Sequence, residues 1–304
     1  MIYRTYLGLD LQANRMRAVS MKRHGISLNL VDGRMIGLEP GVLSPSFRRE
    51  NILDPDAFVA ALREVLDPIS GAEERISLAL PERAGRILLT RVETPLLKKS
   101  EGIEILKWQL RDALPGDAEL QLDYQILNRD ESGRQQLLVT CISQTVLQQY
   151  EDCFNRAGYG PEMIDFRSLC QFNYYRNRLG SDENFVLILA EDRSLVMQVY
   201  QGGIPVYHRA CETAGDVESI YSELSRVLSG ERSRLGGLRR ETVYLHSSQE
   251  ENADLVAALK SLFEKDSIIL LDPELSRFGA PTLALDKSQI RSLVTSIGAA
   301  ERLL

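Results

Sequence analysis

The sequence has no long apolar run. No stretch of its 304 residues approaches the roughly 18 uninterrupted apolar residues from which a membrane-spanning helix is inferred. The opening MIYRTYLGLD lacks the order of charged, apolar and small residues that marks a secretory signal. We therefore expect a soluble, cytoplasmic protein. Because the sequence ends at Leu304 after a helical pattern, continuation of the native chain into a membrane segment is left open.

Cysteine and histidine are also scarce, and neither forms a motif. The four cysteines lie in apolar or helical stretches, without the paired spacing of a zinc or redox site: Cys141, Cys153, Cys170 and Cys211. We interpret them as small buried side chains in a reducing compartment. The three histidines are far apart, at a turn and at strand ends: His24, His208 and His246. We therefore predict no metal site and no catalytic histidine.

Positive charge is in the minority. The chain has 36 Lys and Arg against 43 Asp and Glu, with a net charge of -7 and a pI near 5.3. This balance argues against a nucleic-acid-binding protein, which needs a basic surface to neutralise phosphates. Short basic clusters at Arg48-Arg49, Lys98-Lys99 and 232–240 are interpreted as solvated faces or loops. The length and the 44% of hydrophobic residues favour a globular chain of about two domains.

One segment of the sequence recurs in outline. Residues 7–30 (LGLDLQANRMRAVSMKRHGISLNL) and 185–208 (FVLILAEDRSLVMQVYQGGIPVYH) match at an ungapped shift of 178 positions. Five positions are identical, with Leu9 on Leu187 and Gly25 on Gly203 among them. Both copies read as an apolar strand, a polar turn, an alternating strand, a Gly turn and a further strand. The period is too long for a solenoid, so we predict two lobes of common design.

Strands and helices alternate around the two copies. A helix is predicted from Pro55, with Asp54 as its N-cap and an apolar stripe that includes Phe58 and Leu62. The other elements predicted for the two lobes are strands Tyr6–Leu11, Met16–Arg23, Ile26–Val31, Arg34–Leu38, Ile76–Leu80, Met163–Phe166, Thr242–His246 and Ser267–Leu271, and helices Ser168–Arg178, Asp216–Leu228, Ala253–Lys265 and Lys287–Arg302. This order favours an α/β class with sheets covered by helices.

A self-contained unit interrupts the first lobe. Its predicted elements are strand Gly85–Glu93, helix Ser100–Leu114, strand Leu120–Asn128, strand Gln135–Ser143 and helix Thr145–Ala157. One helical face can cover one sheet, so residues 81–162 are predicted to form an inserted α+β subdomain. The first lobe then comprises 1–80, 163–182 and 286–304, and the second lobe comprises 183–285.

Two lobes that each open with a strand and a hairpin resemble the actin-like, or ribonuclease H-like, superfamily, which includes actin, Hsp70 and FtsA. Within it the likeness is to the PilM family of type IV pilus assembly. LGLDLQANRMRAVSMKRHG resembles that family's N-terminal phosphate motif. LALPERAGRILLTRVETPLLKKSEGIEILKWQLRDALPGDAELQLDYQIL resembles its inserted subdomain, VTCISQTVLQQYEDCFNRAGYGPEMID its helix, glycine turn and return strand, and SIGAAERLL its C-terminal helix.

The departures from the superfamily concern its nucleotide site. ATP-binding members have, in each phosphate loop, an Asp that orients the metal and a Gly two residues later. The first loop keeps Asp10 but has Gln12 in the glycine position, and the second has Ile188 and Ala190 in the two positions. The carboxylates of Glu191 and Asp192 would repel a triphosphate unless a metal intervened.

The adenosine motif departs in the same way, with Ser247 and Ser248 in place of two glycines. The segment between Gly215 and Thr242 is too short for the small subdomain of the second lobe, which we expect to be reduced or absent. The resemblance thus implies vestigial nucleotide loops at Asp10, Gln12, Asn14, Ile188, Ala190, Ser247 and Ser248. We expect no enzyme activity and no cofactor, with ATP and magnesium as ligands only if the degenerate site functions.

The resemblance also implies a partner. In the PilM family the cytoplasmic N-terminal tail of the membrane protein PilN docks in a groove near the inserted subdomain. The partner surface is expected around the first strand and helix of the insert, at Arg86, Leu88, Thr90, Lys98, Lys99 and Trp108. Such a groove suits strand addition or apolar pockets, and a lone Trp suits an anchor.

The reading favoured by the sequence is a non-catalytic scaffold on the inner-membrane platform of a type IV pilus or a related machine. It binds a PilN-like tail and reaches the membrane through its partners. One alternative is the cytoplasmic domain of a type II secretion L-type protein. A second alternative is an active actin-like ATPase or sugar-kinase relative.

Overall fold

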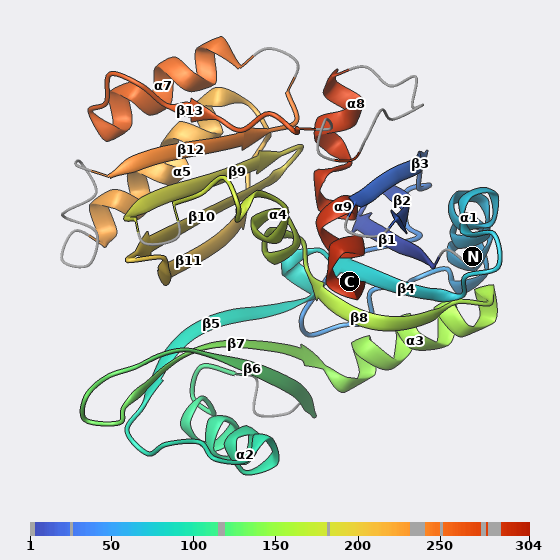
Figure 1. Ribbon diagram of the computed structural model, residues 1–304, viewed down its shortest axis with the longest axis horizontal. Helices are drawn as coiled ribbons and strands as arrows, with labels where there is room; N and C mark the ends of the chain where they lie inside the picture. The colour runs from blue at the N-terminus through green and yellow to red at the C-terminus, as the bar shows by residue number, and fades with distance from the viewer. Residues whose placement is uncertain are drawn as a thin grey trace. The chain divides into compact units, whose positions relative to one another are not determined.

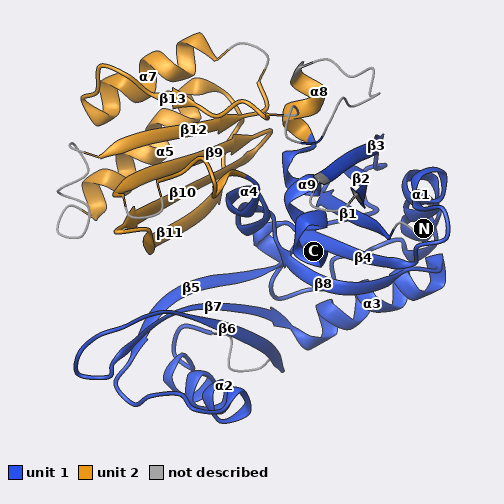
Figure 2. Ribbon diagram, viewed as in Figure 1, with its two compact units in different colours: residues 1–174, 275–284, 293–304 blue, residues 175–274, 285–292 orange. Residues whose placement is uncertain are grey.

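The computed structural model describes residues 4–24, 27–114, 119–180, 183–231, 241–249, 252–274, 278 and 287–304 (Figure 1). It divides into two compact units, the first formed by 1–174, 275–284 and 293–304 and the second by 175–274 and 285–292 (Figure 2). The insert belongs to the first unit. No helix in the described ranges is long and apolar enough to cross a membrane.

Unit 1 contains a five-stranded sheet in the order β3-β2-β1-β4-β8. Its strands are β1 (Thr5–Gln12), β2 (Arg15–His24), β3 (Ser27–Gly37), β4 (Arg75–Leu80) and β8 (Gly160–Phe166). The first three form the predicted antiparallel meander, and β4 and β8 add in parallel. The separate strand predicted at Arg34–Leu38 is wrong: β3 runs through both segments, and a register shift at Ser20-Met21 absorbs the extra residue.

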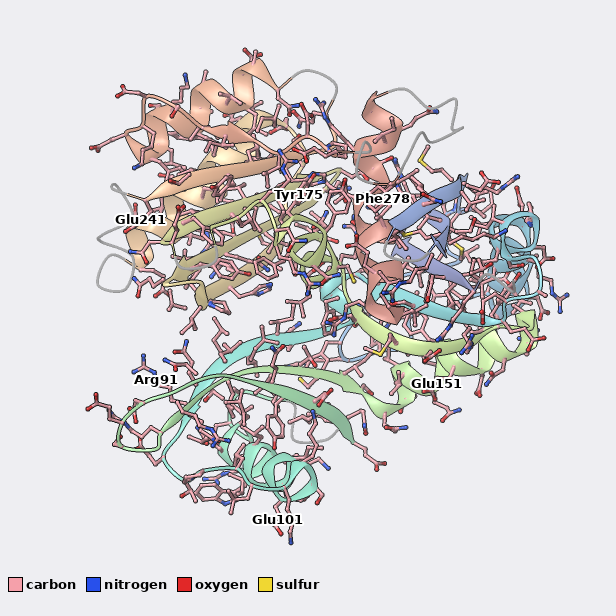
Figure 3. The ribbon with its side chains drawn as sticks, viewed as in Figure 1. Arg91, Glu101, Glu151, Tyr175, Glu241 and Phe278 are labelled. Atoms are coloured by element: carbon pink, nitrogen blue, oxygen red, sulfur yellow. The ribbon has the colours of Figure 1, made fainter. Side chains whose placement is uncertain are left out.

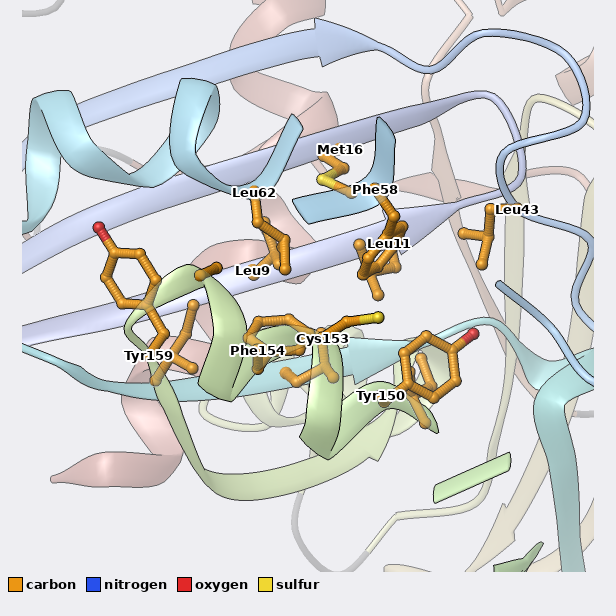
Figure 4. Packing of buried hydrophobic residues seen from close by; sticks show 14 of the residues in the cluster. Leu9, Leu11, Met16, Leu43, Phe58, Leu62, Tyr150, Cys153, Phe154 and Tyr159 are labelled. Carbon is orange, nitrogen blue, oxygen red and sulfur yellow. The ribbon is translucent and has the colours of Figure 1, made fainter. Parts of the chain in front are cut away.

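Two helices cover one face of this sheet (Figure 4). They are α1 (Pro55–Ser70) and α3 (Gln144–Ala157). As predicted, Asp54 caps α1, its carboxylate accepting the Ala57 N–H at 3.0 Å. The predicted end of α3 at Ala157 is also confirmed, and Gly158 follows it with φ 94°. Phe58 of α1 packs edge-on against two aromatic rings of α3. The apolar residues of β1 that point to these helices are therefore Leu7, Leu9 and Leu11.

The opposite face of β1 receives the end of the chain. The closing helix predicted at Lys287–Arg302 is interrupted at Leu293, giving α8 (Lys287–Ser292), α9 (Val294–Ala300) and the short η4 (Glu301–Leu303). A Cβ on Gly8 would lie 2.0 Å from the Ser296 carbonyl oxygen, and one on Gly298 would lie 1.9 Å from the Cys170 carbonyl oxygen. Glycine is therefore required at both contacts of α9, with β1 and with α4 (Arg167–Tyr175).

The insert is a three-stranded antiparallel sheet in the order β5-β7-β6, with one helix on one face. It comprises β5 (Gly85–Val92), α2 (Lys99–Gln109), β6 (Leu120–Arg129) and β7 (Gln135–Ser143), and the single turn η1 (Glu82–Ala84) precedes it. Helix α2 ends before the predicted Leu114, and the chain continues in turns that still bury Leu110 and Leu114. The Nζ of Lys99 donates to the Tyr124 carbonyl and the side chain of Gln109 to the Arg91 carbonyl, so α2 contacts both edge strands.

Unit 2 repeats the sheet of unit 1. Its order is β11-β10-β9-β12-β13, which is again the third, second, first, fourth and fifth strand along the chain. The elements are β9 (Phe185–Glu191), β10 (Ser194–Gln201), β11 (Ile204–Glu212), α5 (Val217–Gly230), β12 (Thr242–Ser247), α7 (Ala253–Phe263) and β13 (Ile269–Leu270). Helices α5 and α7 pack on one face. The predicted duplication of lobes is thus present as architecture.

The hairpin registers correct the alignment of the two copies. Gln12 pairs with Arg15 across the first turn of unit 1, and Glu191 pairs with Ser194 across the first turn of unit 2. The structural shift at this turn is therefore 179 positions, not 178. A slip of one residue exchanges the two faces of a strand, so the correction changes which side chains are equivalent.

Candidate functional site

The first vestigial loop contains a buried cluster of three charged side chains. Asp10, on the α9 face of β1, is fully buried, as are Arg17 and Arg167. The Arg17 guanidinium lies 3.2 Å from Oδ2 of Asp10, and Nε of Arg167 lies 2.5 Å from Oδ1. Arg17 stands directly opposite Asp10 in the hairpin, whereas Arg167 comes from the start of α4. The carboxylate is thus held from two sides.

This arrangement occupies the group that would orient a metal. A carboxylate binds a cation through its oxygen lone pairs, and both Asp10 oxygens accept hydrogen bonds from arginine. Gln12, in the glycine position, is also buried, and the Asn14 carbonyl accepts the Leu38 N–H at 2.8 Å. The loop is therefore closed by internal contacts.

Register counting could have found Arg17 from the sequence. A two-residue turn at Ala13-Asn14 places Asp10 opposite Arg17, two charges in strands that otherwise read as buried. Arg167 gives no such signal, because it is 157 positions from Asp10 and only the packing of α4 brings it there. Its proximity depends on tertiary structure.

The second loop has a different buried pair. Ile188 and Ala190 point toward α5 and α7 as core residues, so neither occupies the position of Asp10. With the corrected register, Leu189 stands at the metal-orienting position and Glu191 at the glycine position. The assignment of Ile188 and Ala190 to these positions is wrong, because the ungapped alignment placed the wrong face of β9 against β1. An apolar side chain and a carboxylate replace the expected Asp and Gly.

Glu191 is part of a buried chain of polar groups. Its Oε1 lies 2.9 Å from Nε2 of His246, and Nδ1 of His246 lies 2.9 Å from the Tyr175 hydroxyl. That hydroxyl donates to the Leu271 carbonyl at 3.1 Å. Glu191 therefore does not project into solvent, where it would repel a triphosphate. These hydrogen bonds connect the end of β9 to β12, to the last residue of α4 and to Leu271, which follows β13.

The two serines of the adenosine motif form local contacts. Ser247 is buried at the end of β12, and its hydroxyl accepts the Gln249 N–H at 3.2 Å. The Ser248 N–H donates to the Ala190 carbonyl at 3.3 Å. The basic segment 232–240, with Gly236-Gly237, lies outside the described residues. In the described ranges, no group of three or more His, Cys, Asp or Glu side chains is arranged to hold a metal.

The cysteines and His208 are also buried to different degrees. Cys141, Cys153 and Cys170 are buried as predicted, whereas Cys211 is partly exposed. Burial raises the pKa of the Cys141 thiol to about 11. Burial lowers the pKa of His208 to about 4. These groups are therefore neutral at pH 7.

The partner residues predicted on the insert lie on β5 and at the two ends of α2, and several of them have local contacts. Arg86 stacks over the Phe47 ring at 4.8 Å, and Leu88 packs on the insert core, while Thr90 is partly exposed on the same strand. Lys98 pairs with Glu101 at 3.0 Å, and Lys99 pairs with Asp123. Figure 3 shows Arg91 and Glu101 projecting from this subdomain.

Trp108 is exposed. Its side chain is 69% accessible on α2, with the Arg111 guanidinium 4.6 Å from the ring centroid. It therefore does not belong to the core of the insert. Its role as an anchor stays a prediction.

A pocket lies where the insert joins the sheet of unit 1. It has a volume of about 110 Å³. Its wall is mainly apolar and comes from the ends of β4, β6, β7 and β8 and the start of α3: Leu80, Leu122, Cys141, Ile142, Leu147, Ile164 and Phe166. Gln121, Asp123, Thr140 and Asp165 add polar groups. An engineered cavity of about 150 Å³ holds benzene, so this space suits one aliphatic side chain.

The pocket carries two carboxylates of unequal exposure. The Asp165 side chain is 12% accessible and that of Asp123 is 68% accessible. Burial raises the pKa of Asp165; Arg302 and the Phe166 N–H oppose this shift, and the carboxylate of Asp123 reinforces it. The sequence gives no sign of this pocket, because its residues come from five elements and none forms a local motif.

The chain is similar to known proteins in its fold and not in its sequence. Protein-family models and curated proteins give no match to the sequence. Among solved structures, the chain is similar to one in the PilM-PilN type IV pilus biogenesis complex, with 18% identity, 98% of each chain covered and a TM-score of 0.76.

Two further structures share the architecture at lower similarity. The ethanolamine utilization protein EutJ from Carboxydothermus hydrogenoformans has 10% identity, 99% and 90% coverage and a TM-score of 0.51. A protein with an actin-like ATPase fold and unknown function from Bacteroides thetaiotaomicron has 12% identity, 88% and 90% coverage and a TM-score of 0.52. This chain therefore has the two-lobed actin-like fold, with a PilM-like arrangement over nearly its whole length.

Proposed function

We propose that this protein is a non-catalytic actin-like scaffold of a type IV pilus machine, which binds the cytoplasmic tail of an inner-membrane partner. The observation that carries the proposal is the apolar pocket between the insert and the end of the unit 1 sheet. The similarity to the PilM-PilN complex supports a PilN-like partner. Through such a partner the protein is held at the membrane.

The pocket suits a short extended peptide. In the described residues β6 pairs with β7 alone, so its other edge is available for strand addition next to the pocket. One apolar side chain of the peptide enters the pocket, while its backbone follows β6 near Gln121 and Asp123. Main-chain hydrogen bonds supply affinity, and the pocket supplies specificity.

The non-catalytic part of the proposal rests on the two internally paired loops. Asp10 is held by two arginines and Glu191 by His246. Binding of a metal nucleotide would require breaking these buried contacts, and a buried charge left without its partner is costly. Both loops therefore stabilise the lobes without a nucleotide.

A binding experiment separates the pocket from the exposed face of α2. Labelled N-terminal peptides of candidate pilus and type II secretion membrane proteins are titrated with the wild type, with Thr140→Trp and with Trp108→Ala. Thr140 is partly exposed and lines the pocket, so an indole there fills the space without removing a core side chain.

We expect Thr140→Trp to weaken binding of the cognate peptide at least tenfold and Trp108→Ala to leave it within about twofold. The opposite pattern would move the site to α2. Absence of binding for all peptides would overturn the scaffold proposal. Selective binding of a type II secretion tail would favour that machine over the pilus.

Nucleotide binding has its own test. A ligand at 100 times its dissociation constant stabilises the folded state by about 2.7 kcal/mol. We expect no thermal shift with millimolar ATP and magnesium. A clear shift would favour the ATPase alternative.

A further inference from the structure

The less exposed carboxylate of the pocket, that of Asp165, forms an ion pair with Arg302 of the same unit. Oδ2 of Asp165 lies 3.3 Å from a guanidinium nitrogen of Arg302, and Oδ1 accepts the Phe166 N–H at 2.8 Å. Asp165 is in β8 and Arg302 in η4, so the ion pair joins the pocket wall to the C-terminal segment of unit 1. The Arg302 side chain is 40% accessible, against 12% for Asp165.

This geometry differs from that of a permanent structural pair. Asp10 is paired with two guanidinium groups that are 1% and 4% accessible. Asp165 has a single contact with an arginine whose side chain reaches solvent. Because the Arg302 guanidinium reaches solvent, water can hydrate it when it leaves Asp165, which makes this ion pair exchangeable.

The charges around Asp165 favour a cation at this position. Arg302 on η4, Asp123 on β6 and the Cys170 thiol on α4 face it, and the thiol is neutral because burial raises its pKa. Asp123 is itself paired with Lys99. The carboxylate of Asp165, whose guanidinium partner reaches solvent, therefore complements a ligand with an apolar group and a positive charge.

We propose that the pocket selects a peptide with a basic side chain next to its apolar anchor, and that Arg302 is the internal competitor for Asp165. This inference rests on the proposed peptide-binding function. In the absence of a partner, Arg302 neutralises Asp165. On binding, the basic side chain of the peptide takes over the ion pair, and Arg302 turns to solvent.

The test compares two forms of the cognate tail peptide. One has its natural arginine or lysine residues, and the other has citrulline, a neutral isostere of arginine, in their place. Binding of both peptides to the wild type, Arg302→Gln, Arg302→Lys and Asp165→Asn is measured by fluorescence anisotropy. Thermal unfolding checks that all three variants are folded. Arg302→Lys retains the competing charge and is the matched control.

We expect the citrulline peptide to bind the wild type about tenfold more weakly than the basic peptide. Arg302→Gln should tighten binding of the basic peptide about three- to tenfold and leave the citrulline peptide unchanged, whereas Arg302→Lys stays close to the wild type. Asp165→Asn should remove the difference between the two peptides.

Two outcomes overturn the inference while leaving the proposed function intact. Equal affinity of both peptides for the wild type would show that no basic group is read. Unchanged or weaker binding of the basic peptide by Arg302→Gln would exclude competition. Failure of every tail peptide to bind would instead overturn the proposed function together with this inference.

The pH dependence of binding is a second readout. Because burial raises the pKa of Asp165 and a bound cation lowers it, protonation competes with the basic peptide. Affinity for that peptide should fall as pH decreases through the raised pKa. In the wild type, the affinity for the basic peptide should fall more than the affinity for the citrulline peptide, and in Asp165→Asn this difference should be absent. An equal fall in affinity for both peptides in the wild type would contradict the role of Asp165.

Discussion

The first hairpins of the two units have the same strand order, but the buried carboxylate in each is paired with a different kind of side chain. In unit 1 the buried carboxylate is Asp10, and its partners are arginines, which stay charged at any pH that the fold survives. In unit 2 the buried carboxylate is Glu191, and its partner is the single imidazole of His246, with Nε2 2.9 Å from Oε1 of Glu191. The two units thus share the backbone of the hairpin, while the carboxylate near each turn is paired with different side chains.

Removal of the Asp10 carboxylate should have the largest effect. Asp10→Ala removes the buried carboxylate that both guanidinium groups contact, and breaking a buried ion pair costs about 3–5 kcal/mol. The chain has two units, so hydrogen exchange of peptides from β1 and β2 is a better measure than one global transition.

The matched control for this change is Asp56→Ala. Asp56 pairs with Arg156 at the surface, with side chains 90% and 49% accessible. Removal of the Asp56 carboxylate should change the free energy of opening measured by hydrogen exchange by no more than about 0.5 kcal/mol. Similar effects of the two variants would show that the buried cluster does not stabilise unit 1.

Loss of the Glu191 charge should have a smaller effect, confined to unit 2. Glu191→Gln keeps a side chain of the same shape that can still hydrogen-bond to His246, so the buried chain of polar groups is weakened and not broken. We expect unit 2 to lose about 1–3 kcal/mol of stability, measured by hydrogen exchange of peptides from β9 and β12. A loss as large as that of Asp10→Ala would contradict the distinction between a carboxylate held by two guanidinium groups and one held by a single imidazole.

Acid should weaken unit 2 through His208. Its pKa of about 4 in the folded state lies below the unfolded value near 6.5, so the unfolded chain binds more protons between these limits. Stability is therefore lost as pH falls from about 6.5 to 4, by at most about 3 kcal/mol. His208→Gln should flatten this part of the pH profile of β10 and β11 exchange. An unchanged profile would show that other groups cause the acid sensitivity.

The smallest effect is expected from restoring one glycine. Gln12→Gly places the residue of ATP-binding relatives in the first loop and should cost about 0.5–1 kcal/mol, because glycine is unfavourable in a strand. No thermal shift with ATP and magnesium should appear, since Asp10 remains paired with its arginines. A shift would show that Gln12 alone closes the loop.

The sequence predicted those parts of the fold that local patterns determine. Both meanders, the Asp54 cap, the end of α3 at Ala157 and β7 agree with the structure, because alternation, caps and turns act over a few residues. The break at Leu293 was missed, since the helical pattern continues across it while the two sides belong to different units.

The candidate sites were less predictable, for a physical reason. The pocket is built by strand ends that meet only after folding, and Asp165 and Arg302 are distant in sequence. The ungapped alignment also assigned Ile188 to the wrong face, because strands of unequal length displace the register at each turn. Trp108 was noticed because it is rare, and rarity says nothing about exposure.

The contact between α9 and β1 has a consequence for synthesis. The hydroxyl of Ser296 donates to the Arg17 carbonyl across 279 positions, and Gly8 leaves no room for any other residue beneath α9. The first strand therefore emerges from the ribosome long before the helix that covers it, while unit 2 is translated in between. During this interval the face of β1 that carries Gly8 and Asp10 lacks the helix that covers it in the folded protein.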